Sequence, residues 1–137
     1  MELAVAATFV WLGMVVGISF LEAPLKFRAP GVTLPIGLGI GRLVFRALNA
    51  VEAVLAVLVV VGLLAGSPGR AAVVAFLVAA AALVVQVLAV RPFLSRRSDA
   101  VLAGDDGPRS RAHLWYVGLE LVKVAALVTA GVLLLGR

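Results

Sequence analysis

The sequence contains no cysteine and few charged residues. The lack of thiols excludes a disulfide scaffold, a thiolate metal site and a cysteine nucleophile. Charged residues make up 14% of the 137 residues, against roughly 25% in a typical soluble domain. Hydrophobic residues make up 64%, more than a soluble domain of this length can hide from water. The composition argues against a soluble enzyme or a disordered tail and predicts a chain that lies in lipid.

Four apolar runs are long enough to cross a bilayer as helices, which takes about 20 residues each. The runs are residues 3–21, 41–66, 70–90 and 114–136. Backbone polar groups in lipid must be satisfied within the segment, and the runs lack the alternation typical of barrel strands. We therefore predict a single all-α membrane domain over residues 1–137, a bundle of four transmembrane helices. The acidic Glu2 and the lack of a cleavage pattern indicate a retained first span rather than a signal peptide.

The connections between the spans differ in character. Segment 23–40 contains Pro24, Pro30 and Pro35, and prolines interrupt helices. We expect an irregular Pro/Gly-rich segment there, re-entrant or interfacial, packed on the bundle. Residues 67–70 have the composition of a tight turn, and residues 91–112 that of a longer polar loop.

The net charge of +5 comes from basic residues near the ends of the apolar runs. A basic chain can bind nucleic acid, but these residues interleave with no aromatic platform, so we expect no nucleic-acid partner. Most of them flank the first and third connections: Lys26, Arg28, Arg42, Arg46, Arg91, Arg96, Arg97, Arg109 and Arg111. The positive-inside rule then predicts both long connections in the cytoplasm and both termini outside, in the cell's inner (plasma) membrane.

Polar residues at membrane depth are the candidate functional residues, because a charged group there costs roughly 3 kcal/mol on insertion scales. Steps of three and four residues return to one face of a helix, and two spans carry polar stripes with this spacing. The stripe of the second span is Arg42, Arg46, Asn49 and Glu52, and that of the fourth span is His113, Tyr116, Glu120 and Lys123. The other spans end in the supporting residues Glu22, Gln86 and Arg91.

Both stripes fall in the cytoplasmic half of the predicted bundle, whereas the outer half is almost entirely apolar. This asymmetry predicts a polar pocket that opens to the cytoplasm and binds a small solute or ion. Two other interpretations remain open. The basic residues and His113 can snorkel to the headgroups, and Glu52, Glu120 and Lys123 can form an ion-pair network that sets helix register. One histidine with dispersed carboxylates is a poor metal or haem site, so we expect no metal and no cofactor.

Small residues recur at four-residue steps in three of the spans. These seams are Gly13/Gly17, Gly62/Gly66 and Ala71/Ala75/Ala79. Seams of this kind let transmembrane helices approach closely. They serve either the bundle itself or a homo-oligomer, and we expect an oligomer because four short spans enclose little volume.

The chain resembles a small bacterial membrane family of unknown function that is grouped with transmembrane protein 205-like proteins. The resemblance covers most of the chain in outline, and it depends on Trp11, Phe20, Phe27, Arg91-Pro92 and Arg111-x-His113. It implies the four-span fold and no settled activity. The family pattern places a polar residue seven positions after the histidine. Here that residue is Glu120, whereas the eukaryotic members have asparagine there.

Three functions from different classes fit these features. The first is a transporter or channel-like protein in which Glu52, Glu120 and Lys123 are the buried charges. The second is a non-catalytic accessory or scaffold subunit of a membrane complex, with the small-residue seams as partner surfaces. The third is an enzyme on a lipid-soluble substrate, with His113 as acid or base and Tyr116 and Glu120 as its partners. The absence of a nucleophile–base motif disfavours the third, and the polar stripes favour the first.

Overall fold

The computed structural model describes residues 1–103 and 111–136, and these residues form long helices. Four helices are long and apolar enough to cross a membrane: Glu2–Arg28, Leu34–Ala65, Arg70–Leu94 and His113–Leu135. Their elements are α1 (Glu2–Val15), η1 (Val16–Glu22), α2 (Ala23–Leu25), η2 (Lys26–Arg28), α3 (Leu34–Ala65), α4 (Arg70–Val85), η3 (Gln86–Val90), α5 (Arg91–Leu102) and α6 (Arg111–Leu135). The all-helical class and the four apolar helices agree with the sequence.

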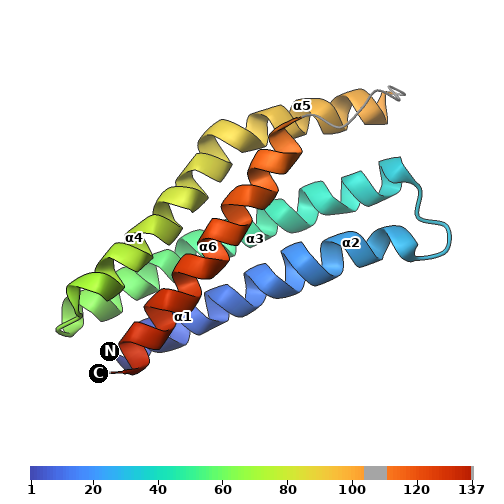
Figure 1. Ribbon diagram of the computed structural model, residues 1–137. Helices are drawn as coiled ribbons and strands as arrows, with labels where there is room; N and C mark the ends of the chain where they lie inside the picture. The colour runs from blue at the N-terminus through green and yellow to red at the C-terminus, as the bar shows by residue number, and fades with distance from the viewer. Residues whose placement is uncertain (104–110, 137) are drawn as a thin grey trace.

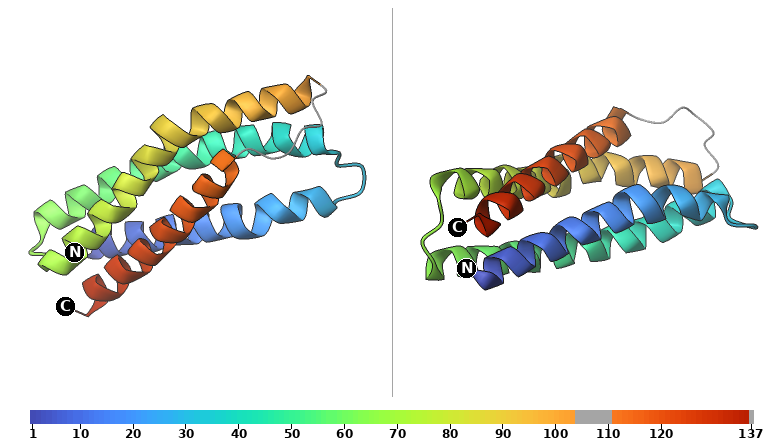
Figure 2. Two further views of the ribbon diagram at one scale, coloured as in Figure 1. Left: turned by 45° about the horizontal axis from the view of Figure 1, so that its top comes forward. Right: turned by 60° about the horizontal axis from the view of Figure 1, so that its bottom comes forward.

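The helices run alternately up and down in an elongated bundle (Figures 1 and 2). Both chain termini and the short α3–α4 turn lie at one end of the bundle, which we call the terminal end. The α2–α3 connection and α5 lie at the opposite end, the loop end. Helix α1 packs against α3 and α6, and α4 packs against α6.

The first connection is shorter than the sequence analysis predicted. We expected irregular backbone over residues 23–40, but only residues 29–33 between η2 and α3 are non-helical. Pro24 is the second residue of α2 and follows a π-helical stretch, and Pro35 lies in the first turn of α3. A missing backbone N–H costs little in the first turn of a helix, where Pro35 lies. Pro24 lies inside the continuous helix Glu2–Arg28, and the π-helical stretch before it accommodates the interruption.

The start of α3 is capped by its own sequence. The backbone N–H of Ile36 donates to Oγ1 of Thr33 at 3.4 Å, and a threonine at this position is a common helix cap. Gly31 has a φ of 82°, which glycine adopts without strain. The second span therefore begins at Leu34 rather than near residue 41.

The third connection was also predicted as a loop from residue 91, and its first half is helical instead. Helix α4 continues through η3 into α5, which ends at Leu102. Pro92 is the second residue of α5 and again follows a π-helical stretch, where helices commonly accommodate an interruption. Residues 104–110, including Arg109, lie outside the described residues.

Close approach of backbones holds the terminal end together. A Cβ on Gly62 would lie 2.6 Å from the backbone nitrogen of Ala4, and a Cβ on Gly131 would lie 2.7 Å from the Phe9 ring. The buried Trp11 ring packs edge-to-face on Phe76 at a centroid distance of 6.3 Å. Small residues thus let α1 approach α3 and α6, as in other membrane bundles.

The outer surface of the bundle is apolar. Large aliphatic side chains are widely exposed, up to 81% for Leu64. Soluble proteins rarely expose contiguous apolar area on this scale. This surface, together with the four candidate spans, supports a membrane protein.

The small-residue seams have different roles in the structure. Gly62 and Gly66 pack against Ala4 and Met1 of the same chain, so this pair serves the bundle itself. Gly13 and Gly17 have no described neighbour within 4 Å of an added Cβ. In the third seam Ala75 and Ala79 are buried and Ala71 is exposed. Of the glycine pairs, Gly13/Gly17 is the one left open.

Candidate functional site

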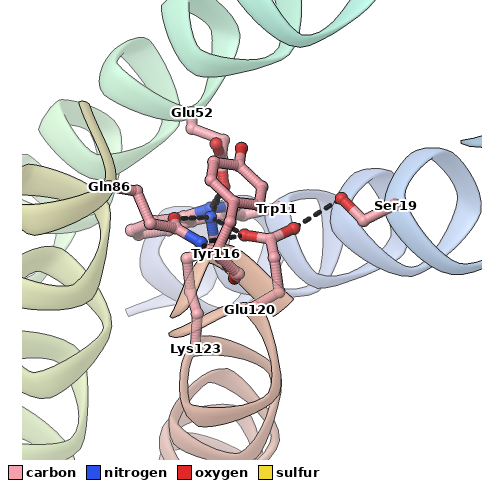
Figure 3. Close-up of polar contacts among 7 residues, drawn as sticks. All are labelled: Trp11, Ser19, Glu52, Gln86, Tyr116, Glu120 and Lys123. Carbon is pink, nitrogen blue, oxygen red and sulfur yellow. Dashed lines mark hydrogen bonds and ion pairs between the residues drawn. The ribbon is translucent and has the colours of Figure 1, made fainter. Parts of the chain in front are cut away.

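Polar side chains from all four spanning helices meet inside the bundle (Figure 3). We call this group the charge cluster; its members are Trp11, Ser19, Glu52, Gln86, Tyr116, Glu120 and Lys123. Helix α3 supplies Glu52, and α6 supplies Tyr116, Glu120 and Lys123 at steps of four and three residues. Because these steps return to the same face of a helix, three residues of α6 point into the bundle together.

Lys123 lies at the centre of the charge cluster. Its Nζ is 2.6 Å from Oε1 of Glu52 and 2.5 Å from Oε1 of Glu120. It also donates a hydrogen bond of 2.8 Å to Oε1 of Gln86. An ammonium group has three N–H donors, so each finds an acceptor. The side chain is 0% exposed, and this full complement of partners is what makes a buried ammonium tolerable.

Glu120 is held by donors on both of its carboxylate oxygens. Oε1 accepts a hydrogen bond of 2.8 Å from Nε2 of Gln86 as well as the contact with Lys123. Oε2 accepts a hydrogen bond of 2.5 Å from Oγ of Ser19. Hydrogen bonds to an ionised acceptor are stronger than neutral ones, so this environment suits an ionised Glu120.

The two carboxylate oxygens of Glu52 differ in their partners. Oε1 accepts a hydrogen bond of 2.8 Å from Nε1 of Trp11 and contacts Lys123. Oε2 is buried, yet it has no hydrogen-bond partner among the described residues. The same holds, within the described chain, for both polar atoms of the Asn49 amide and for the Tyr116 hydroxyl. Buried polar groups are nearly always hydrogen-bonded, so these atoms are the least satisfied polar groups of the site.

The charge cluster lies near the middle of the spans. Measured along the helix axes at 1.5 Å per residue, Glu52 is about 20 Å from Ala65 and Lys123 is about 18 Å from Leu135. A hydrocarbon core is about 30 Å thick. The two carboxyl groups and the ammonium group are therefore far from both aqueous surfaces if the helices span a bilayer.

The rest of the predicted second-span stripe lies outside the charge cluster. Arg42 forms an ion pair of 2.6 Å with Asp99 of α5, between partly exposed side chains, and Arg46 is exposed. At 3.6 residues per turn, Arg46 and Glu52 are about 120° apart around α3. The stripe drifts around the helix between Arg42 and Glu52, so only Asn49 and Glu52 turn inward.

The remaining predicted residues occupy the periphery of the site. His113 and Arg91 are half-buried near the starts of α6 and α5. Glu22 lies 3.8 Å from Nζ of Lys26, one turn further along the same helix. Of the supporting residues, Gln86 alone belongs to the charge cluster, where it bonds to both Glu120 and Lys123.

Two members of the charge cluster were not predicted as site residues. Trp11 was noted only for the family resemblance, and Ser19 was not singled out. Tryptophan in membrane proteins concentrates at the two interfaces, whereas Trp11 lies about 14 Å along α1 from Glu2 by helical rise. That depth was a usable signal for Trp11. A single serine in an apolar helix carries no such signal.

The described residues contain no group of three His, Asp or Glu side chains that could hold a metal ion. Lys123 instead lies between the two carboxylates, where a bound cation would otherwise balance them. A groove of about 720 Å³ lies between α4 and α6, with an almost wholly apolar lining that runs from Arg70 to Leu133. No member of the charge cluster lines that groove.

Comparison of the chain with models of known protein families, with curated proteins and with solved structures finds no match. The resemblance to the transmembrane protein 205-like group therefore stays a prediction, and the charge cluster is the feature that bears on function.

Proposed function

We propose that this chain is a small integral protein of the inner membrane that binds and transports a small ion through the charge cluster. The observation that carries the proposal is the composition of the cluster: two glutamates share one lysine, and all three are buried. Ionisable groups at membrane depth are rare because they are expensive. Transmembrane helices that contain such groups commonly line an ion pathway.

The main alternative is an ion-pair network that only fixes helix register. Such a network is most stable when its charges balance and each polar atom is satisfied. The charge cluster has neither property, since it holds more acidic than basic groups and leaves Oε2 of Glu52 without a partner in the described chain. These two features favour a site that takes up a further charge.

The distribution of polar groups supports access from one side. Asn49 lies on α3 one turn from Glu52 toward the loop end, and Arg46 and Arg42 follow further along. On the terminal side, the cluster meets the buried apolar residues Val59 and Leu127. The basic residues gather at the loop end, so the positive-inside rule places that end in the cytoplasm. The ion then enters the site from the cytoplasm.

The proposal is tested by flux measurements in proteoliposomes. Purified protein is reconstituted, and the uptake of protons, sodium and potassium is measured with trapped fluorescent indicators under an imposed gradient. Glu52→Gln and Glu120→Gln are expected to reduce flux at least tenfold. Glu2→Gln is the matched control, because Glu2 is an exposed glutamate far from the charge cluster. If no ion moves, or if both cluster variants transport as fast as the control, the proposal is wrong.

A second candidate is a scaffold subunit that associates through α1. Gly13 and Gly17 lie one turn apart with open space beside them in the described structure, and such pairs let a second transmembrane helix approach. A stoichiometric partner that copurifies in mild detergent and is lost in Gly13→Leu would support this function.

A further inference from the structure

We infer that the ion bound by the charge cluster is a proton, and that Glu52 holds it on Oε2 while Glu120 stays ionised against Lys123. The role of this proton as the transported ion depends on the proposed function. Its position on Glu52 does not, because that follows from the contacts and charges of the cluster.

The first step is a charge count. The charged and titratable groups that face Glu52 are Lys123, Glu120 and Tyr116, all from α6, with Arg91 of α5 half-buried beyond them. Helix α1 contributes a neutral indole and η3 a neutral amide. With both glutamates ionised, Glu52, Glu120 and Lys123 together carry one excess negative charge. One bound proton makes the group neutral, which is favourable where solvation is poor.

The second step decides which glutamate carries the proton. Three side chains donate to Glu120, and together they cover both of its oxygens. A proton on Glu120 would compete with one of these donors. Oε2 of Glu52 meets no donor in the described part of the chain, so a proton there displaces nothing.

The third step identifies what the new O–H group bonds to. A protonated carboxyl is a donor and needs an acceptor. Asn49 precedes Glu52 by three residues and shares its face of α3, and its Oδ1 is buried without a partner among the described residues. The Tyr116 ring extends beside Glu52 (Figure 3) and interacts electrostatically with it. Asn49 is therefore the expected acceptor, and the Tyr116 hydroxyl is the next group in the chain of polar atoms.

The same polar atoms supply a path for exchange. The proton arrives from a hydronium ion at the loop end; an O–H bond of the hydronium breaks and one at Oε2 of Glu52 forms, leaving water. The carboxylate becomes neutral, and the excess charge of the cluster falls from one to zero. Release is the reverse step, and no oxidant or co-reactant is required.

An alkali cation fits the space beside Oε2 of Glu52 less well than a proton does. Such an ion needs a full shell of oxygen ligands to replace its water. Among the described residues, the free oxygens here are Oε2 of Glu52, Oδ1 of Asn49 and the Tyr116 hydroxyl, too few for a dehydrated cation. A proton needs one donor atom and one acceptor.

Infrared spectroscopy of the protein in lipid nanodiscs tests the inference without a transport assay. A protonated carboxyl gives a C=O stretch that ionised carboxylates lack and that shifts in heavy water. We expect one such band at neutral pH in the wild-type protein. Glu52→Gln removes it directly. Glu120→Gln is also expected to remove it, because Lys123 then balances an ionised Glu52. Glu2→Gln leaves it in place.

Two near-isosteric variants locate the proton. Asn49→Leu removes the proposed acceptor and is expected to shift the band, whereas Ser19→Ala, which touches only Glu120, leaves its frequency unchanged. The inference is overturned if the wild type shows no band, if Ser19→Ala shifts it and Asn49→Leu does not, or if sodium abolishes it. A band without proton flux would contradict the proposed function and support the protonated Glu52. Flux of another ion without a band would support a transport function and contradict the protonated Glu52.

Discussion

Lys123 and Glu52 form an ion pair of 2.6 Å between α6 and α3, and both side chains are 0% exposed. The pair joins helices that are otherwise separated by α1 and α4 in the packing of the bundle. It also brings Glu120 into the same group, because Nζ of Lys123 contacts both carboxylates. Lys123 thus supplies the positive charge that stabilises both carboxyl groups of the charge cluster.

Replacing Lys123 by methionine removes this positive charge and keeps most of the side-chain volume. We expect Lys123→Met to lower the free energy of unfolding by about 3–5 kcal/mol, the usual cost of leaving a buried charge without its partner. Thermal unfolding in detergent micelles measures the loss as a lower Tm.

A matched variant separates charge from packing in that experiment. Adding Glu120→Gln to Lys123→Met removes the carboxylate that the lysine balanced, so it is expected to recover part of the lost stability. If the double variant is as unstable as the single one, the loss comes from packing and the charge argument fails.

Trp11 contributes a hydrogen bond and a packed ring, and the two are separable. Trp11→Phe keeps an aromatic ring against Phe76 but leaves Oε1 of Glu52 without its indole donor. The expected cost is about 1–3 kcal/mol, typical of a buried polar group that loses a hydrogen-bond donor. Trp115 is 68% exposed, so Trp115→Phe is the control and should leave Tm nearly unchanged. Equal losses from both would show that ring volume alone matters.

The sequence predicted the class of fold because apolar runs of sufficient length have few alternatives in lipid. It also predicted one polar stripe on each of two spans, since periodicity assigns residues to a helix face. Five of the eight stripe residues are buried in the structure: Asn49, Glu52, Tyr116, Glu120 and Lys123.

Other features depended on how the helices are rotated and where they begin, which periodicity does not determine. Arg46 shares the predicted stripe, yet the drift along α3 turns it outward. Segment 23–40 contains three prolines, yet Pro35 lies in the first turn of α3 and Pro24 follows a π-helical stretch, so neither ends a helix. Ser19 of η1 became part of the site only because the first span packs against α6.

The contact between Gly62 and Ala4 gives a test of the packing at the terminal end. A Cβ on Gly62 would lie 2.6 Å from the nitrogen of Ala4, a backbone atom that cannot step aside. We expect Gly62→Ala to cost about 1–3 kcal/mol through overpacking. Gly13→Ala meets open space in the described structure, so its effect on the free energy of unfolding should stay within about 0.5 kcal/mol. If Gly62→Ala leaves the free energy of unfolding unchanged, the close approach of α1 and α3 is contradicted.

The orientation of the bundle can be tested directly, because the chain has no cysteine. Ser67 lies exposed in the turn at the terminal end, and Ala29 lies exposed in the connection at the loop end. The basic residues near Ala29 predict that the loop end lies in the cytoplasm. A membrane-impermeant maleimide added to intact cells should therefore label Ser67→Cys and spare Ala29→Cys, while permeabilised cells show both. The cysteine-free parent is the blank. The reverse pattern would invert the topology, and the proton would then enter Glu52 from the outer side of the membrane.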